Sequence, residues 1–483
     1  MTIKWTNLIL LVVISGVVSA TPFSSPSDYV QVYEGNGHYI QYRGQPLIPI
    51  GANPGWVATL QKLDYDYRAE FEALHESGGN LLRLSPFITP GMEDETRFDE
   101  RVNCLPWAKV DTYVYDLDLE WSGGNPAFWE RLRQVLDLAY ELDHIVALEL
   151  WDLYGPARGP KFTPNRWAAH PFYPGNNKNL TGEQELDRET DMLDIALCRP
   201  VTRGPDSNPE ALRLLEMYIR SLLDVLSQYP NIIYIITNET SAAKSWSDYW
   251  VDFVHAYFRK NLPDYPYLVG VMPREFQHSK NFTIQDLILD PRMDFADASQ
   301  YLSWMDQCDI HMKNYLDLMA QYPSCVKPIL NVKNYMRTDV SALWSAVLVG
   351  AATTRFHRPA AATPEADWQI QLRGVKFLRE FLNRYEIHPW NMHPEPWRFP
   401  RGRYTEKQTF CLVNEKKMVV YFHNALDEVH VPWPGGGYRE KVPSESIIGI
   451  IDPGNYRGLW YDPEDGTAMD IGRFHQHRTG VRV

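Results

Sequence analysis

Carboxylates, amides and basic side chains recur at the ends of short apolar runs along this chain. Runs of this kind predict buried strands, and in a parallel barrel the reactive groups lie at the carboxyl ends of the strands. The residues at these positions are Arg83, Glu149, Asp152, Asn238, Glu239, Glu275, Asp297, Tyr301, Lys333, Arg355, His357 and Arg358. Carboxylates are prominent among them, and a facing pair of carboxyl groups suits general acid and base or nucleophilic roles. The sequence therefore points to acid–base chemistry at the strand ends.

Histidine spacing does not support a metal site. No HExxH run or comparable pattern surrounds His170, His311 or His357, so we expect these to be mainly hydrogen-bonded structural histidines. We predict neither a bound metal nor a cofactor.

The elements that position the candidate residues are eight short apolar runs separated by long amphipathic segments. The runs are Leu47–Gly51, Asn80–Leu84, Ile145–Leu150, Ile232–Thr237, Tyr267–Met272, Met293–Ala298, Pro328–Val332 and Val349–Thr354. Asn125-Pro126 and Asn208-Pro209 each place an N-cap before a proline at the first helical position. Because strands and helices alternate and no Gly-rich phosphate loop follows the first strand, the pattern predicts a (β/α)₈ barrel rather than a doubly wound sheet.

Composition changes on both sides of the barrel segment. Ahead of it, Glu34-Gly35-Asn36-Gly37 within the alternating stretch Tyr29–Tyr42 predicts a β-hairpin. Behind it, short β-type runs separated by Gly, Pro and Asn turns predict a small β-sandwich. The predicted divisions are a signal peptide at 1–20, an N-terminal β-hairpin at 21–45, the barrel at 46–386, a linker at 387–404 and the β-sandwich at 405–483. The predicted fold class is α/β, a TIM barrel followed by a small C-terminal β-sandwich.

The first twenty residues have the three-part layout of a secretory signal peptide. Lys4 supplies the single charge, Leu8 to Val18 is apolar, and small residues stand at Ser19 and Ala20. The apolar stretch is short for a membrane span, so we expect cleavage after Ala20 and secretion, with an uncleaved N-terminal anchor as the alternative. After cleavage no membrane association is expected.

The acidic composition limits the partners. Among 483 residues the formal net charge is −14, and no basic run provides a footprint for a phosphate backbone. A nucleic-acid partner is therefore not expected, and the oligomeric state is left open. The five cysteines are too few and too scattered for a disulfide scaffold, and their pairing also stays open.

Several segments resemble the (β/α)₈-barrel glycoside hydrolases of the large retaining clan, clan A, that includes cellulases and β-galactosidases. They are Asn80–Arg83, Tyr229–Glu239 and Lys327–Asn331, and the Asn-Glu pair that ends the fourth strand is the most specific mark. Trp167–Asn179 and Gly458–Gly466 also resemble a subgroup in which a C-terminal β-sandwich associated with collagen binding follows the barrel. The resemblance implies a protein that hydrolyses O-glycosidic bonds in a poly- or oligosaccharide.

The resemblance also implies roles for individual residues. Glu239 would be the general acid/base, Asn238 would hold the sugar 2-hydroxyl, and Arg83 would position the substrate. Glycoside hydrolysis needs two carboxyl groups, one to protonate the leaving oxygen and one to attack the anomeric carbon or activate water. Further candidates for substrate contact are Trp151, Trp167, His170, Tyr301 and Lys333. Indole rings near strand ends suit stacking on sugars, although part of these tryptophans is expected in the core.

The chain departs from this family at the second carboxyl group. The clan has a nucleophilic Glu at the end of the seventh strand, and alignment of Lys327–Asn331 with that strand puts Lys333 there. An ammonium cannot replace a carboxylate nucleophile, and beside Glu239 it would lower the pKa of that carboxyl group, which a general acid needs to keep high.

Three interpretations of Lys333 follow. Another carboxylate takes the role, the barrel is a pseudoenzyme that binds carbohydrate without cleaving it, or the strand alignment is displaced and the protein acts otherwise. The candidates for the second carboxylate are Asp297, Glu275 and Asp152.

Each candidate also has a structural interpretation. Glu239 would stabilise the start of the following helix, Arg83 would pair with a carboxylate inside the barrel, and Glu149 and Asp152 would be solvated loop groups. A further alternative gives the C-terminal domain the main role, in adhesion to matrix or cell-wall protein, with the barrel as a scaffold.

Overall fold

The computed structural model describes most of the predicted barrel and part of the C-terminal region. The described residues are 25–86, 104–111, 114–151, 170–172, 175–180, 209–238, 244–273, 283–299, 308–334, 336–359, 363–395, 407–424, 447–449, 454–463, 465–476 and 481–482. The predicted signal peptide lies outside them. Within these ranges, no helix has both the length and the apolar character that crossing a membrane requires.

A three-stranded antiparallel sheet precedes the barrel, where the sequence predicts a two-stranded hairpin. Its strands are β1 (Gln31–Val32), β2 (Ile40–Tyr42) and β3 (Gln45–Leu47). Arg43 and Gly44 join β2 to β3, and both have positive φ, at 50° and 70°. Two such residues form a tight turn whose twist matches an antiparallel pair. The sequence does not predict the third strand, because arginine is an uncommon residue at positive φ.

Eight parallel strands form the barrel in the described chain, and each overlaps a predicted run. They are β4 (Ile50–Gly51), β5 (Leu81–Leu84), β8 (Ile145–Trp151), β9 (Ile232–Thr237), β10 (Leu268–Gly270), β11 (Ala296–Asp297), β12 (Ile329–Leu330) and β13 (Thr354–Arg355). Six pair in the order β10-β9-β8-β5-β4-β13, and β11 pairs with β12. The Asp294 N–H donates to Val269 O at 2.9 Å, and the Ala352 N–H donates to Ile329 O at 2.7 Å. These bonds link the two groups of strands on both sides, so the sheet closes on itself.

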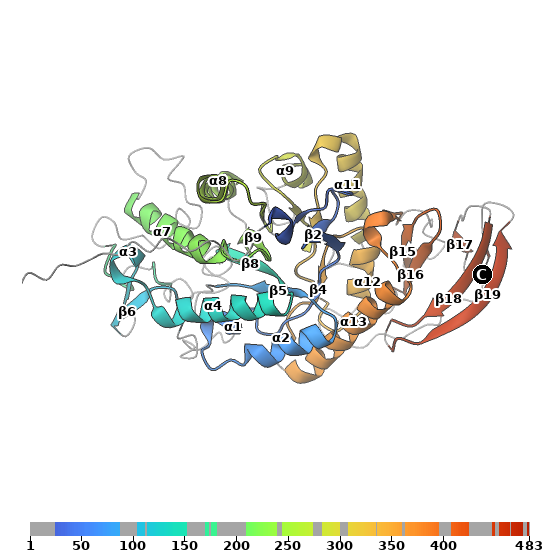
Figure 1. The fold of residues 1–483 in the computed structure, drawn as a ribbon, viewed down its shortest axis with the longest axis horizontal. Coiled ribbons are helices and arrows are strands. Elements are labelled where there is room, and N and C mark those ends of the chain that lie inside the picture. Colours follow the sequence, from blue (N-terminus) through green and yellow to red (C-terminus); the bar gives the residue numbers. More distant parts are fainter. Residues whose placement is uncertain are drawn as a thin grey trace, which may run out of the picture.

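Helices lie around the strands and cover the outside of the barrel (Figure 1). The longer ones are α2 (Tyr67–Glu76), α4 (Pro126–Glu141), α7 (Pro209–Leu226), α8 (Lys244–Asn261), α11 (Cys308–Gln321), α12 (Ser341–Leu348) and α13 (Pro364–Arg384). The shorter ones are α1 (Ala58–Gln61), α3 (Leu119–Ser122) and α9 (Ile284–Leu289), and β6 (Ala108–Asp111) pairs with β7 (Val114–Asp116) after the second barrel strand. The predicted Asn125-Pro126 start is confirmed, because the Asn125 side chain accepts a bond from the Ala127 N–H at 3.2 Å.

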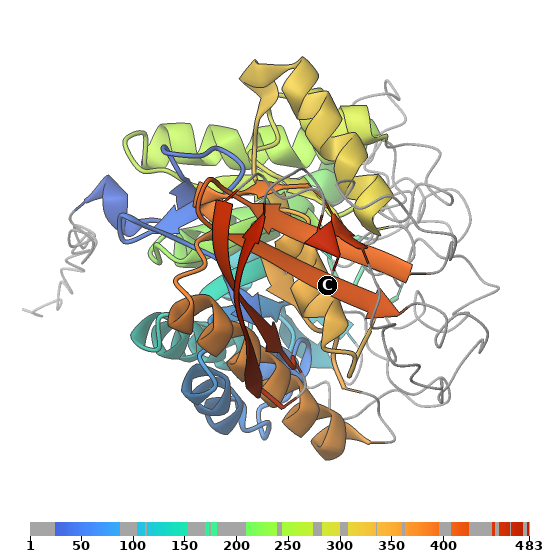
Figure 2. The ribbon, with the colours of Figure 1, turned by 90° about the vertical axis from the view of Figure 1, so that its right-hand side faces the viewer.

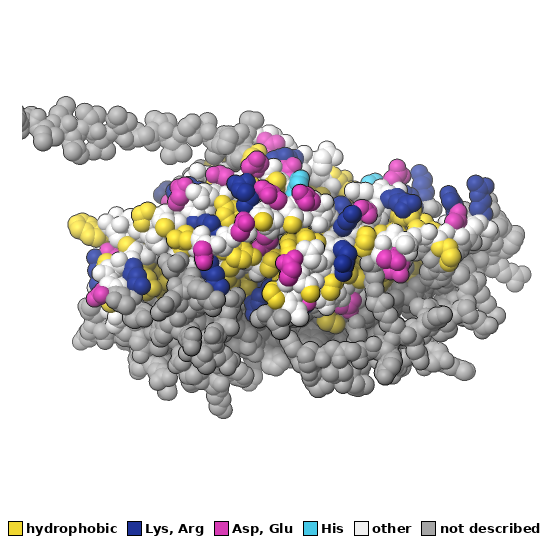
Figure 3. All heavy atoms as spheres, turned by 90° about the horizontal axis from the view of Figure 1, so that it is seen from below, with side chains coloured by type: hydrophobic (Ala, Val, Ile, Leu, Met, Phe, Trp, Pro, Cys, Tyr) yellow, Lys and Arg dark blue, Asp and Glu magenta, His cyan; other side chains and the backbone are white. Residues whose placement is uncertain are grey.

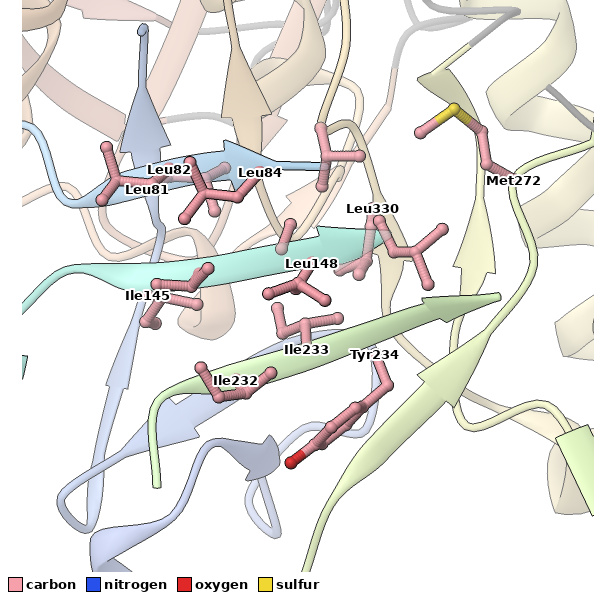
Figure 4. Packing of buried hydrophobic residues seen from close by; sticks show 14 of the residues in the cluster. Leu81, Leu82, Leu84, Ile145, Leu148, Ile232, Ile233, Tyr234, Met272 and Leu330 are labelled. Atoms are coloured by element: carbon pink, nitrogen blue, oxygen red, sulfur yellow. The ribbon is translucent and has the colours of Figure 1, made fainter. Parts of the chain in front are cut away.

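Apolar side chains of adjacent parallel strands fill the interior. Figure 4 shows β5, β8 and β9 side by side, with Leu82, Leu148 and Ile233 among the packed residues. All three are fully buried, and each such side chain stabilises the fold by about 1.5–3 kcal/mol. Leu82 is opposite Val146 and Leu148 is opposite Tyr234 in the parallel register. The carboxyl ends of the strands therefore meet at one edge of the barrel.

The C-terminal region contains antiparallel strands, as predicted. They are β14 (His393–Pro394), β15 (Lys407–Val413), β16 (Met418–Asn424), β17 (Ile447–Gly449), β18 (Gly454–Tyr461), β19 (Ala468–Gln476) and β20 (Val481–Arg482). β14, β15 and β16 form one sheet, β18 pairs with β19, and β17 pairs with β20. A sheet region is therefore present, and its division into the two packed sheets of a sandwich stays a prediction.

Aromatic side chains join these strands to the barrel helices. Trp344 of α12 stacks on Tyr421 of β16 with ring centroids 6.2 Å apart, and Tyr461 of β18 lies 4.9 Å from Phe381 of α13. The Tyr461 hydroxyl also donates to Phe377 O at 3.1 Å. Figure 2 looks onto the C-terminal strands and shows them in front of the barrel helices. The described strands nearest the barrel are therefore packed against it.

One face of the molecule shows how charge is distributed over the described surface. On the face in Figure 3, acidic, basic and apolar side chains are intermixed among the described residues. A surface that binds a phosphate backbone is instead basic over a continuous area. This face therefore gives no reason to expect a nucleic-acid partner.

Candidate functional site

Arg83 on β5 pairs with Glu149 on β8 inside the barrel. Arg83 Nε donates to Glu149 Oε1 at 2.8 Å, and Nη2 donates to the same oxygen at 2.5 Å. Both side chains are almost fully buried. The structural interpretation of Arg83, as the partner of a carboxylate inside the barrel, is confirmed.

The same guanidinium orients Asn238, which directly follows β9. Arg83 Nη2 donates to Asn238 Oδ1 at 2.8 Å. The second oxygen of Glu149 accepts a bond from Trp56 Nε1 at 3.1 Å, and the Arg83 guanidinium lies 4.2 Å from the centre of the Trp56 ring. Charge-assisted bonds and the cation–π contact together fix the arginine. Four side chains from three strands and the loop after β4 thus form one preorganised polar network.

Lys333 belongs to this network. It follows β12, the seventh barrel strand, and its Nζ donates to Asn238 Oδ1 at 3.4 Å. Only 4% of Lys333 is exposed. One amide oxygen therefore accepts bonds from two cations. The structure brings together Arg83, Asn238 and Lys333, which the sequence predicts to share a site.

Asp297 ends β11 and is held by the serine two residues further on. Oδ1 accepts from the Ser299 N–H at 3.0 Å and Oδ2 from Ser299 Oγ at 2.9 Å. Ser299 Oγ in turn accepts from the Val332 N–H at 2.9 Å, one residue before Lys333. Burial raises the pKa of Asp297 to about 7, against the effect of the bonds from Ser299. Asp297 is therefore a carboxyl group that exchanges a proton near neutral pH and supports the backbone beside Lys333.

Asn53, in the loop after β4, is a site residue that sequence reasoning missed. Its Oδ1 accepts from the Arg83 N–H at 3.1 Å, from Arg355 Nε at 3.0 Å and from Arg355 Nη2 at 2.5 Å. Its Nδ2 donates to Arg83 O at 3.1 Å. Asn53 therefore ties β13 to β5. Its place directly after the first barrel strand is the signal that could have identified it, because the same position after the other strands marks the rest of the site.

Glu70 on α2 binds the same loop. Its Oε2 accepts from the Gly55 N–H at 3.0 Å and from the Tyr65 hydroxyl at 2.5 Å. Burial raises the pKa of Glu70 to about 7, although these bonds and the nearby Arg355 act in the opposite direction. Glu70 is therefore only partly ionised at neutral pH.

His357 and Arg358 follow β13. His357 is buried, and burial lowers its pKa well below the usual range, with Lys333, Arg358 and Arg83 adding to the decrease. The imidazole is therefore neutral at neutral pH. Arg358 is half-buried, and its guanidinium lies 5.5 Å from the centre of the Trp56 ring.

Two predicted sugar contacts lie in the core. Trp151 is 4% exposed, and its ring lies 5.1 Å from Tyr218 and 5.2 Å from Trp250. His170 is 5% exposed, its Nδ1 accepts from the Phe172 N–H at 3.1 Å, and burial lowers its pKa to about 3. Both rings are enclosed by other side chains, because aromatic groups bury a large area when they pack together. Contact of either ring with a sugar stays a prediction.

The remaining predicted residues are Glu239, Glu275, Asp152, Trp167 and Tyr301, and they lie outside the described residues. Their roles stay predictions. Within the ranges that the structure describes, no three His, Cys, Asp or Glu side chains are grouped to hold a metal ion.

Comparison with known proteins adds evidence about the fold. No protein-family model matches the chain, and no curated protein matches its sequence. A crystal structure of a glycoside hydrolase family 5 protein from Bacteroides vulgatus aligns with a TM-score of 0.55 at 15% identity, over 95% of this chain and 90% of that chain. The fold is that of a glycoside hydrolase barrel. A second structure, described as a glycoside hydrolase, aligns with a TM-score of 0.53 at 14% identity, over 95% of this chain and 93% of that chain.

At these identities the likeness establishes the fold, and function has to be argued from the site. The predicted (β/α)₈ barrel is confirmed. The network of Arg83, Glu149, Asn238 and Lys333 lies where β5, β8, β9 and β12 end, at the edge where barrel enzymes have their active sites.

Proposed function

We propose that this is a carbohydrate-active protein that hydrolyses O-glycosidic bonds of a poly- or oligosaccharide at the carboxyl ends of the barrel strands. The observation that carries the proposal is the buried network of Arg83, Glu149 and Asn238, which fixes the amide directly before Glu239 in the sequence. Polar groups held rigidly at this edge are what positioning a sugar for reaction requires. The likeness in fold to glycoside hydrolases supports the proposal.

Two carboxyl groups share the proposed reaction. Glu239 protonates the leaving oxygen as the glycosidic bond breaks. Asp297 accepts a proton from the water that attacks the anomeric carbon, a role that a pKa of about 7 supports. Glu275 and Asp152 are the alternatives for this second role. Use of a water molecule in place of a covalent intermediate predicts inversion at the anomeric carbon.

Binding of a glycan without cleavage is the second candidate function, and Lys333 favours it. The Lys333 ammonium is buried 3.4 Å from Asn238 Oδ1, at the end of the strand from which the resembling family supplies a nucleophilic carboxylate. A fixed positive charge there opposes the positive charge that develops at the anomeric carbon. The site would then keep the sugar-binding groups and lack turnover.

Secretion is part of the proposal and is supported by the N-terminal sequence. Residues 1–20 combine one lysine, an apolar run and terminal small residues, as secretory signals do. Secretion would bring the protein to glycans outside the cell. The size of the secreted form, measured by mass spectrometry, tests cleavage after Ala20.

The test is a screen for released reducing sugar across polysaccharides and aryl glycosides, with Glu239→Gln beside the native protein. Glu365→Gln, at the exposed start of α13, is the matched control. Hydrolysis predicts release by the native protein and the control and its loss in Glu239→Gln, with an inverted first product. Saturable binding of one glycan without release from any substrate supports the second candidate. Neither release nor binding would contradict both.

A further inference from the structure

We propose that Glu70 of α2 is a positioning residue that holds the loop after β4, residues 52–57, and through this loop sets the geometry of the network around Arg83 and Glu149. This inference rests on the proposed function and names how its site is regulated. Glu70 is 5% exposed and belongs to a helix outside the barrel strands, so it acts on the groups that bind the sugar and not on the sugar itself.

The loop after β4 carries two of the side chains that hold the network. Asn53 Oδ1 accepts from the Arg83 N–H at 3.1 Å, and Trp56 Nε1 donates to Glu149 Oε2 at 3.1 Å. The Trp56 ring also lies 4.2 Å from the Arg83 guanidinium. The Ser85 N–H donates to Trp56 O at 3.1 Å, which binds the loop to the end of β5. A displacement of this loop therefore changes the surroundings of Arg83 and Glu149 together.

Glu70 binds the middle of this loop. Its Oε2 accepts from the Gly55 N–H at 3.0 Å and from the Tyr65 hydroxyl at 2.5 Å. A Cβ atom on Gly55 would lie only 2.6 Å from Glu70 Oε2 and 2.3 Å from Tyr65 Cε1. Glycine therefore lets the carboxyl group approach the backbone closely. Because Gly55 lies between Asn53 and Trp56, one carboxyl group fixes the segment that carries both.

The ionisation of Glu70 determines how strongly it binds the loop. Burial raises its pKa to about 7, and the hydrogen bonds from Tyr65 and Gly55 act in the opposite direction. Arg355 and Asn53 act in the same direction as these bonds, to a smaller extent. A carboxylate accepts stronger hydrogen bonds than a neutral carboxyl group does. As the pH rises past 7, Glu70 therefore loses its proton and holds Gly55 more firmly.

Arg355, from β13, links the charge of Glu70 to the network directly. It is fully buried, and its Nε and Nη2 donate to Asn53 Oδ1 at 3.0 and 2.5 Å. Among the described residues, all its hydrogen bonds go to neutral oxygens. The carboxyl groups of Glu70 and Glu149 both act on its pKa. Ionised Glu70 therefore stabilises a cation that is bound to the same loop.

Two further titratable groups lie close to α2. Arg131 of α4 donates to Tyr65 O at 2.6 Å, on the residue whose hydroxyl binds Glu70. His144 lies 3.0 Å, through Nε2, from Phe71 O of α2, and burial lowers its pKa to about 4. The arginine stays charged and the histidine stays neutral between pH 5 and 9. Neither group therefore changes its charge while Glu70 ionises.

The test follows the indole N–H signal of Trp56 by NMR as the pH is raised from 5 to 9. Its chemical shift reports the hydrogen bond to Glu149, and Trp56→Phe assigns the signal. In the native protein the signal should move with a midpoint near pH 7. Glu70→Gln keeps the size of the side chain and cannot ionise, so this movement should be lost. Glu76→Gln, exposed on the same helix, is the matched control and should titrate as the native protein does.

Asp297 is the competing source of such a titration. Its pKa is also about 7, and it interacts electrostatically with Glu149. Asp297→Asn is therefore measured beside Glu70→Gln. The inference predicts that the Trp56 signal still titrates in Asp297→Asn. Loss of the titration in Asp297→Asn together with its persistence in Glu70→Gln would overturn the inference.

Tyr65→Phe gives a second measurement that does not depend on the folding of Glu70→Gln. The tyrosine hydroxyl binds Glu70 Oε2 and lowers the pKa of that carboxyl group. Its removal should therefore shift the midpoint of the Trp56 titration to higher pH. Tyr322→Phe, 43% exposed, is the matched control and should leave the midpoint in place. An unchanged midpoint in Tyr65→Phe would contradict the proposed link between Glu70 and Trp56.

Affinity electrophoresis connects the loop to sugar binding. The probes are galactomannan, xyloglucan and arabinoxylan, each at pH 6 and pH 8. The native protein should bind at least one of them about threefold more tightly at pH 8, as expected for a change of about one hydrogen bond. Glu70→Gln should lose this dependence on pH, and Glu76→Gln should keep it. Binding of equal strength at both pH values in the native protein would overturn the proposed regulation.

The NMR outcome separates this inference from the proposed function, because it needs no glycan. A Trp56 signal that titrates equally in the native protein and in Glu70→Gln would overturn the inference and leave the proposed function intact. Loss of the titration in Glu70→Gln, without binding or release of any glycan, would support the positioning role of Glu70 and contradict the proposed function.

Discussion

Lys333 Nζ lies 3.4 Å from the Oδ1 atom of Asn238, and Arg83 Nη2 lies 2.8 Å from the same oxygen. One amide oxygen is thereby held by a cation from β5, in the six-stranded group of barrel strands, and by a cation from the end of β12, in the two-stranded group. The orientation of the Asn238 amide is fixed, with its Oδ1 turned toward the two cations. Lys333 is thus an integrated part of the network.

Replacement of Lys333 by methionine should raise the pKa of His357. Lys333 is the largest electrostatic contributor to the depressed pKa of this buried imidazole, so its removal makes a proton on the ring less unfavourable. Burial remains, and the pKa should therefore stay below the ordinary value of about 6.5. Titration of selectively labelled histidine by NMR measures the change. Lys376→Met, on the outer face of α13, is the control and should leave the His357 signal unmoved.

The barrel could be predicted from sequence because its signals are local. Each barrel strand overlaps a continuous apolar run, and the Asn125-Pro126 start of α4 is encoded by a capping side chain. The third strand of the N-terminal sheet was missed because its turn uses Arg43 at positive φ, which no common sequence signal marks. In the C-terminal region, consecutive strands pair with each other except for β17, which pairs with β20 beyond β18 and β19, and periodicity alone does not specify that pairing.

The position of the site could be predicted from the sequence, but the contacts of its side chains could be predicted only in part. Strand ends locate Arg83, Asn238 and Lys333, because the parallel register carries them to one edge. Whether an aromatic ring is buried or exposed is not determined by the local sequence in the same way. Trp151 also stands at the end of a barrel strand, but its ring packs on Tyr218 and Trp250, because two helices supply rings that enclose it. Burial of this kind depends on residues that are distant in sequence.

Replacement of Arg83 by methionine should destabilise the protein by about 3–5 kcal/mol, because it leaves the Glu149 carboxylate buried without its cation. Replacement of both residues, Arg83→Met with Glu149→Leu, should recover part of this loss since no unpaired charge remains. Denaturant unfolding of the two single variants and the double variant measures the coupling. Additive losses would show that the pair does not interact as the geometry indicates. Arg373→Met, exposed on α13, controls for loss of an arginine as such.

Asp297 should make stability fall as the pH rises. Its pKa is raised from 3.8 to about 7 in the folded state, so between these values the folded protein keeps a proton that the unfolded chain has released. The free energy of unfolding therefore decreases with pH across this window, by at most about 1.4 kcal/mol per pH unit for this group. Asp297→Asn cannot ionise and should unfold with a shallower pH dependence, becoming relatively more stable above pH 7. If the free energy of unfolding changes with pH in the same way for the native protein and this variant from pH 4 to 8, the raised pKa is contradicted. Asp137→Asn, on the exposed side of α4, is the control.

Trp344 should couple the C-terminal strands to the barrel. Its ring is 3% exposed and lies 4.9 Å from Phe381, 5.6 Å from Tyr461 and 6.2 Å from Tyr421, so it contacts the barrel helix α13 and two C-terminal strands at once. Trp344→Ala should cost about 3–5 kcal/mol, as expected for a large buried aromatic group. Calorimetry should resolve two transitions in this variant where the native protein shows one, because the strands lose the ring that joins them to α13. Trp121→Ala removes a tryptophan that is 83% exposed and should change stability by less than about 0.5 kcal/mol. A single unshifted transition in Trp344→Ala would mean that other contacts hold the C-terminal strands against the barrel.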